Sequence, residues 1–369
     1  MSDRIYSIDS TRAIAMVFVV AIHADPFRGI GTYGNAANFV IESTGRFAVP
    51  FFFVTAGYLF AAKRSRTDGR YVSKYVTRVT SLYGRALVVY APIALVLAAG
   101  MAVGSERGVA NAVIERGLEA ASPLGLVYYG DSVAFHLWFL PALVISIALV
   151  YAFVATEKTR YLLPVAIAFH AVGILGETTG VHVPLETRDA LFFGFFYTSL
   201  GYCLRSWDWS PDPSRRGRYL ALAVLFGIVH LLERYALGYV LGDASMRHGV
   251  YEPEYTLATA LFVAALFVFL LSSPSLGRTT RLPEIGANAV LIYVAHPIVL
   301  YSLDETAKFL GVGDFALPVT LLWHLLLVPV AYVGTLALAV LVVRADVVQR
   351  LSDAISHRRS NSTMAGQSR

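Results

Sequence analysis

Three ionisable residues, Asp9, Arg12 and His23, lie in the first long apolar segment of the chain. An α-helix turns about 100° and rises about 1.5 Å per residue, so the step from Arg12 to His23 makes almost three whole turns. The two side chains therefore share one face, roughly 16 Å apart, and Asp9 lies on that face one turn before Arg12. An ion pair near one end of an apolar helix, with an imidazole deeper inside, indicates proton transfer or nucleophilic chemistry.

Other histidines lie in or beside apolar segments: His136, His170, His230, His296 and His324. If the helices alternate in direction, His23 and His296 reach a similar depth, and we expect them to share one cavity. For His170 and His230 no surrounding motif indicates chemistry. We therefore expect each of these two to bond a backbone carbonyl of a neighbouring helix.

A dense run of basic residues follows the second apolar segment: Lys63, Arg64, Arg66, Arg70, Lys74, Arg78 and Arg85. Lys74 and Arg78 are four residues apart and share a helix face, so they could bind the phosphates of an anionic ligand. The alternative is ordinary cytoplasmic positive charge that contacts anionic lipids. The run alone does not decide between the two.

The elements that must position these residues are membrane helices. The chain has 369 residues, 56% of them hydrophobic and only 15% charged, against about 25% charged in soluble domains. Apolar windows of about 20 residues predict an all-α, polytopic bundle of ten transmembrane helices, near 10-27, 45-62, 84-103, 136-155, 161-177, 188-205, 218-237, 255-273, 284-302 and 318-343.

The distribution of charge predicts the orientation of this bundle. Most of the 30 basic residues fall in alternate loops, which places both termini in the cytoplasm by the positive-inside rule. The net charge of +5 then follows from topology, and we expect no nucleic-acid partner. The single cysteine, Cys203, excludes an internal disulfide and a Cys-rich metal site. A cleaved signal peptide is the alternative for residues 1-24, but Asp3 and Asp9 are acidic where such a peptide is basic.

No soluble domain is predicted. We expect one membrane domain over residues 1-349 and a disordered cytoplasmic tail over 350-369, which is rich in Ser, Arg, Asn and Gln. The longest gap between apolar segments contains an amphipathic stretch at 105-121, which predicts a short interfacial helix.

Four phrases of the sequence together resemble the acyltransferase type 3 family. They are Asp9, Arg12 and His23 in the first helix, Arg46 to Tyr58, His136 to Leu140, and Tyr293 to Pro297. Their order and spacing cover nearly the whole chain. The family consists of integral-membrane enzymes that move acetyl or other acyl groups onto glycans, lipids and antibiotics.

The resemblance implies an acyl-CoA donor, acetyl-CoA first, and a glycan, lipid or small-molecule acceptor with a hydroxyl group, as in polysaccharide O-acetylation. His23 would be the catalytic base or would carry the acyl group, and Arg12, paired with Asp9, would orient the donor. The CoA would be bound by Lys74, Arg78, Arg64 and Arg85, and the acceptor by His136, Trp138, Tyr293 and His296. The expected location is the plasma membrane as a multi-pass protein, and no metal is expected.

Two positions depart from the family pattern. Ala56 stands where the family usually has a serine, although Thr55 next to it could supply a hydroxyl. Tyr75 stands where the family has the first of two arginines, and Lys74 beside it could compensate.

A different class of protein also accounts for the intramembrane charges. In a proton-coupled transporter or glycan exporter, Asp9, Arg12, His23 and His296 would form a relay. That hypothesis leaves the four phrases and the basic run unexplained. Consumption of acetyl-CoA by membranes that contain the protein would discriminate between the two.

Overall fold

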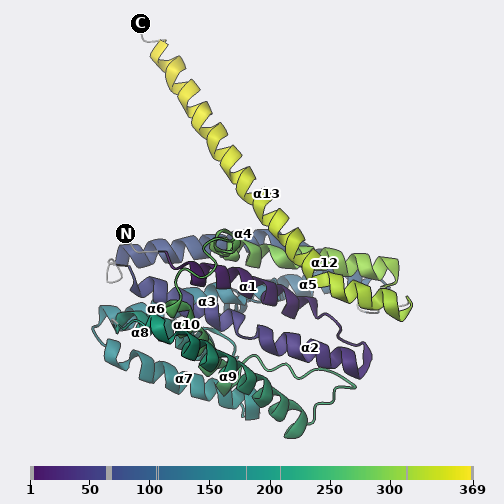
Figure 1. Ribbon diagram of the computed structural model, residues 1–369. Coiled ribbons are helices and arrows are strands. Elements are labelled where there is room, and N and C mark those ends of the chain that lie inside the picture. Colours follow the sequence, from purple (N-terminus) through teal and green to yellow (C-terminus); the bar gives the residue numbers. More distant parts are fainter. Residues whose placement is uncertain are drawn as a thin grey trace. The chain divides into compact units, whose positions relative to one another are not determined.

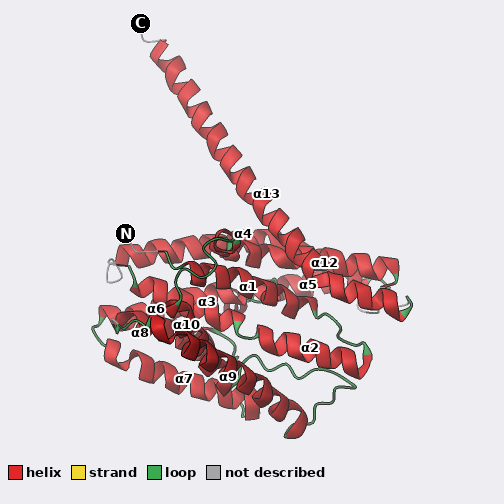
Figure 2. Ribbon diagram, viewed as in Figure 1, coloured by secondary structure: helices red, strands yellow, loops and turns green. Residues whose placement is uncertain are grey.

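The computed structural model describes residues 4–63, 69–104, 106, 108–179, 181–207, 209–312 and 315–366, with side chains as far as Arg344. Within these ranges the chain is helical and contains no strand (Figures 1 and 2). The predicted all-α class is therefore confirmed. The helices are α1 (Tyr6–Ala24), α2 (Gly31–Gly45), α3 (Ala48–Ala61), α4 (Gly69–Ala102), α5 (Val109–Ala120), α6 (Phe139–Ala155), α7 (Thr159–Thr179), α8 (Phe195–Ser206), α9 (Arg216–Tyr235), α10 (Leu257–Ser272), α11 (Leu282–Ala287), α12 (Ala289–Leu310) and α13 (Leu317–Gly366).

Seven helical stretches in the described residues are long and apolar enough to cross a membrane. They are Tyr6–Ala24, Gly31–Ala61, Gly69–Ala102, Phe135–Ala155, Thr159–Thr179, Pro213–Val240 and Leu317–Arg344. The other three predicted windows also coincide with helices, but α8 and α10 have only 12 and 16 residues, and α12 carries charged residues near its end. A multi-pass membrane protein is supported, while the count of ten and the orientation stay predictions.

The hydropathy windows missed the helix α2 and the first half of the helix α4. The helix α2 precedes the predicted second segment and buries polar side chains, among them Asn35, Asn38 and Glu42. A hydropathy window penalises such residues, although here they face protein and not lipid. The helix α4 begins at Gly69, fifteen residues before its window. The window begins later because the exposed Lys74 and Arg78 lower the mean hydropathy of the first half of this helix.

The chain divides into two compact units, Met1–Ala287 and Asn288–Arg369. In the first unit, α1 packs against α2, α3, α10 and α11, and α3 packs along α8. Short helical turns complete this unit: η1 (Gly125–Tyr129), η2 (Phe135–Trp138), η3 (Ala190–Gly194), η4 (Pro213–Arg215) and η5 (Ala236–Val240). In the second unit, α12 packs against α13.

Two predictions concern the periphery of these units. The amphipathic stretch at 105-121 contains α5, a helix without buried residues that packs on α4, so the predicted helix exists. The helix α13 extends to Gly366. The predicted disordered tail over 350-369 and the single domain over 1-349 stay predictions.

The contact between α3 and α8 depends on two glycines that face each other's backbone. A Cβ at Gly57 would lie 1.9 Å from the carbonyl oxygen of Thr198, and a Cβ at Gly201 would lie 2.0 Å from that of Val54. Small residues that let two helix backbones approach are typical of membrane helix packing. Gly57 belongs to the second phrase of the sequence, so part of that phrase is explained by packing.

We expect Gly57→Ala to lower the stability of the protein, by about 1–3 kcal/mol, because the added methyl group forces α3 and α8 apart. Gly84→Ala is the matched control, since a Cβ at Gly84 in α4 meets no atom within 4 Å. Thermal unfolding of the purified protein in lipid nanodiscs measures both variants. Equal unfolding temperatures for the two would contradict the packing role of Gly57.

Candidate active site

The first helix carries the predicted polar track. The carboxylate of Asp9 accepts a hydrogen bond from Nη1 of Arg12 at 3.4 Å, which confirms the predicted pair, and a second from Nε of Arg4 at 2.8 Å. Arg4 also donates to the carbonyl of Pro283 at 2.8 Å. A Cβ at Gly286 would lie 1.7 Å from the carbonyl oxygen of Asp9, so α11 closely holds the start of α1.

The Arg12 guanidinium lies beside the basic start of α4. Its side chain is 17% exposed, and Tyr75 of α4 lies within its electrostatic reach. Lys74 and Arg78 flank Tyr75 in the sequence and are exposed. The structure therefore brings the first-helix ion pair to the same end of the unit as the basic run.

The basic residues of α4 form one stripe. Lys74, Arg78 and Arg85 are spaced by four and seven residues, which places them on one helix face. All three are exposed, and within the described residues none of them forms an ion pair. Arg64 lies outside the described residues. An exposed row of unpaired cations can bind an anionic ligand.

At the other end of α1, His23 is exposed and lies beside η2. Its ring contacts Phe135 edge-on at 6.2 Å between centroids. His136, which follows Phe135 in the sequence, is buried and lies within electrostatic reach of His23. The centres of the His136 and Tyr90 rings lie 4.7 Å apart. The structure thus places His136 near His23, while its predicted contact with the acceptor stays a prediction.

A guanidinium covers the aromatic residues of η2. The Arg188 guanidinium lies 4.3 Å from the ring centre of Phe135 and 5.4 Å from that of Trp138, within the range of cation–π contacts. Its Nη1 pairs with Oε1 of Glu254 at 3.1 Å. Trp138, which the sequence predicted at the acceptor, is thus a neighbour of a charged network that the sequence analysis missed.

The centre of that network is Arg46, which precedes α3. Arg46 pairs with Glu42 and, through Nη1, with Oε2 of Glu254 at 2.5 Å. Arg46, Glu254 and Arg188 all lie within electrostatic reach of His23. His23 is therefore an exposed imidazole in the electrostatic field of charges of both signs, and such charges can stabilise charge that develops in a reaction.

The helix α9 holds two partners of Arg46 in place. Arg234 is fully buried and donates from Nε to the hydroxyl of Ser43 at 2.9 Å and from Nη1 to the carbonyl of Pro253 at 2.7 Å. Ser43 follows Glu42 in the sequence and Pro253 precedes Glu254. One side chain of α9 therefore ties together the two backbone segments that carry the acidic partners of Arg46.

His230 and His170 agree with their expected structural roles. Nε2 of His230 lies 2.9 Å from the carbonyl oxygen of Ser43, and Nδ1 of His170 lies 3.0 Å from that of Phe192. Both rings are buried. Each histidine thus bonds a backbone carbonyl of a neighbouring element.

Tyr293 and His296 belong to the second unit. In α12, Nδ1 of His296 lies 2.6 Å from the carbonyl oxygen of Tyr293, and the two rings lie 5.7 Å apart. Both side chains are buried. The predicted cavity shared by His23 and His296 would join the two units, and it stays a prediction.

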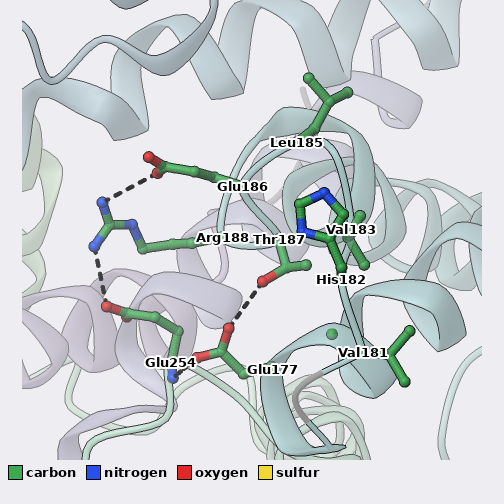
Figure 3. A pocket seen from close by; sticks show the side chains of 10 residues that line it. Glu177, Val181, His182, Val183, Leu185, Glu186, Thr187, Arg188 and Glu254 are labelled. Atoms are coloured by element: carbon green, nitrogen blue, oxygen red, sulfur yellow. Dashed lines mark hydrogen bonds and ion pairs between the residues drawn. The ribbon is translucent and has the colours of Figure 1, made fainter.

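A pocket of about 450 Å³ opens beside this network, where α7 ends (Figure 3). Arg188 and Glu254 form part of its wall, together with residues of the segment after α7. The other lining residues are Gly176, Glu177, Val181, His182, Val183, Leu185, Glu186 and Thr187. Among the described side chains, no group of three or more His, Cys, Asp or Glu residues could hold a metal ion.

The charges around Glu254 affect its titration. Burial raises the pKa of the Glu254 carboxyl, whereas Arg46 and Arg188 lower it and prevail, so that its pKa lies below the usual value for glutamate. The stabilisation by this carboxylate is therefore present above the pKa of glutamate in the unfolded chain and is lost as the pH falls through the lower folded-state value.

We expect Glu254→Gln to lower the stability by about 1–3 kcal/mol at neutral pH, because it leaves Arg46 and Arg188 without a shared carboxylate. Glu252→Gln is the control, since Glu252 pairs with the more exposed Arg28 at 2.5 Å and such surface pairs contribute little. Thermal unfolding in nanodiscs gives both values. The difference between wild type and Glu254→Gln should shrink in acid, and a constant difference would contradict the titration of Glu254.

Comparisons with known proteins identify the family. The family model described as "Acyltransferase domain" (acyltransferase 3) matches residues 5–344. An "Amino-acid racemase" of Enterococcus faecalis is 23% identical over 328 residues, which are 85% of this chain and 43% of that protein. A "Serine/alanine racemase" of Enterococcus gallinarum is 23% identical over 79% of this chain and 40% of its own length.

The chain thus spans less than half the length of these curated relatives. No solved structure matches. The family model covers nearly all of the described helices, and its match agrees with the four phrases in the sequence. The chain belongs to the acyltransferase 3 family.

Proposed function

We propose that the protein transfers an acyl group, acetyl first, from a cytoplasmic acyl-CoA to a hydroxyl group of a glycan, lipid or other acceptor. The proposal rests on the placement of charged residues at the two ends of α1, in a chain that belongs to the acyltransferase 3 family. One end of α1 presents Arg12 beside the basic start of α4, and the other presents the accessible His23 beside Arg46 and Arg188.

The donor would bind at the α4 end. Its phosphates would contact Lys74, Arg78 and Arg85, with Arg64 as a further candidate. Arg12 and His23 lie about 16 Å apart along the helix. An extended pantetheine arm could span this distance. A guanidinium does not lose its proton in a protein, so Arg12 suits the orientation of the donor and not proton transfer.

His23 would act where the thioester meets the acceptor. As a base it takes the hydroxyl proton while the oxygen attacks the thioester carbonyl. The carbon–sulfur bond then breaks, and the CoA thiolate leaves and regains a proton. As a carrier it would instead hold the acyl group on its ring before transfer to the hydroxyl. His136, Trp138, Tyr293 and His296 are the candidates for contact with the acceptor.

We expect His23→Ala to reduce transfer at least about 100-fold, because no other group replaces the base or carrier. Release of free CoA from radiolabelled acetyl-CoA by purified protein in vesicles measures the reaction. His248→Ala, at an exposed loop histidine, should leave the rate unchanged. Normal transfer by the folded His23→Ala variant would exclude His23 from the reaction.

We expect Lys74→Gln combined with Arg78→Gln to weaken donor use while sparing chemistry. The KM for acetyl-CoA should rise about tenfold or more with kcat retained, because charge-assisted contacts to phosphate are lost. Lys158→Gln, at an exposed lysine, is the control. A fall in kcat at constant KM would place the donor elsewhere, and absence of any CoA binding by wild type would favour the transporter hypothesis.

A further inference from the structure

The segment after α7, which lines the pocket, packs against the end of that helix. A Cβ at Gly176 would lie 2.8 Å from Cγ2 of Val183 and 2.9 Å from Cγ2 of Thr187, so the segment after α7 folds back closely onto the helix. The Tyr255 hydroxyl donates to the carbonyl of Thr187 at 2.9 Å. The pocket wall is thereby held by buried elements, and its volume of about 450 Å³ is in the range of small-molecule sites.

Arg188 is common to this pocket and to the surroundings of His23. On one side it lines the pocket and pairs with Glu254 (Figure 3). On the other it covers Phe135, whose ring contacts His23 edge-on. The pocket and the surroundings of His23 therefore adjoin each other at Arg188.

The charges of the lining are not balanced. Arg188 is the one arginine or lysine among the described lining residues, and it is shared between Glu254 at 3.1 Å and Glu186 at 3.9 Å. Glu177 accepts hydrogen bonds from the neutral hydroxyl of Thr187 at 2.8 Å and the backbone N–H of Glu254 at 2.5 Å. Within the described residues Glu177 forms no ion pair, so its carboxylate is oriented at the pocket wall but not neutralised.

We propose that this pocket binds the acceptor, and that it selects hydroxyl compounds that carry an ammonium group, such as amino sugars or amino alcohols. The ammonium group would lie against Glu177 and Glu186, and the hydroxyl group would extend past Arg188 towards His23. An anionic acceptor would lie against the carboxylate of Glu177, which forms no ion pair within the described residues, and is disfavoured. The role of the bound compound as acceptor rests on the proposed acyl transfer, whereas its binding in the pocket does not.

Binding is measured on the full chain in lipid nanodiscs with a thiol introduced by His182→Cys. The native Cys203 is buried, and the unmodified chain measures its background. The probes are glucosamine, glucose and glucuronate at a slightly acidic pH, where the amine is charged. Each probe is tested for its ability to slow maleimide labelling at position 182.

Glucosamine should protect the thiol at a concentration about tenfold lower than glucose, because a charge-assisted contact is added, and glucuronate should protect least. Glu177→Gln should abolish the preference for glucosamine, and Glu115→Gln on α5 should preserve it. Equal protection by all three sugars, absence of protection by glucosamine, or a preference that survives Glu177→Gln would each overturn the proposal.

Release of CoA from acetyl-CoA by the same preparation separates this inference from the proposed function. Turnover of acetyl-CoA without protection by glucosamine would refute the pocket alone. Protection by glucosamine in a protein that neither binds nor consumes acetyl-CoA would refute acyl transfer and leave the pocket as a cation-selective site.

Discussion

The first unit depends on the mutual neutralisation of Arg46, Glu42, Glu254 and Arg188. Charges withdrawn from water are expensive unless each has a partner, and here the partners come from sequence positions as far apart as 208 residues. Pairing therefore fixes the segment between α2 and α3 against the segment before α10. Arg234 of α9 ties the same two segments through Ser43 and Pro253. These ion pairs thereby position Arg46, Glu254 and Arg188, whose charges act on His23.

The two ends of α1 carry different chemistry. At its start, Asp9 is held by Arg4 and Arg12, and α11 lies against its carbonyl. Near its end, His23 meets the aromatic residues of η2 and the Arg46 network. In the proposed acyl transfer, this rigid helix would keep the donor contact at Arg12 and the reacting group at His23 about 16 Å apart. The preorganised charges near His23 would then stabilise the reacting oxygen without rearrangement.

The spacing of residues along a single helix predicted part of this site. The ion pairs between residues far apart in the sequence could not be predicted from such spacing. The Asp9–Arg12 pair and the helical face of Lys74 and Arg78 were predictable because they depend on the geometry of one helix. Arg46 was visible in a recognised phrase, but its partner Glu254 lies in a loop whose acidic residues were interpreted only as topology. Glu42 was missed with α2 itself, because its polar side chains face protein. A search for paired opposite charges flanking apolar windows is the signal that could have found them.

In the proposed function, one acyl-CoA molecule would span the first unit from the start of α4 to His23. Electron cryo-microscopy of the full chain in a nanodisc with a non-cleavable thioether analogue of acetyl-CoA tests it directly. The phosphates should contact Lys74 and Arg78, and the acetyl carbonyl should lie within hydrogen-bond or attack distance of the His23 ring. An analogue bound with its phosphates away from α4, or with its acetyl group remote from His23, would contradict the claim.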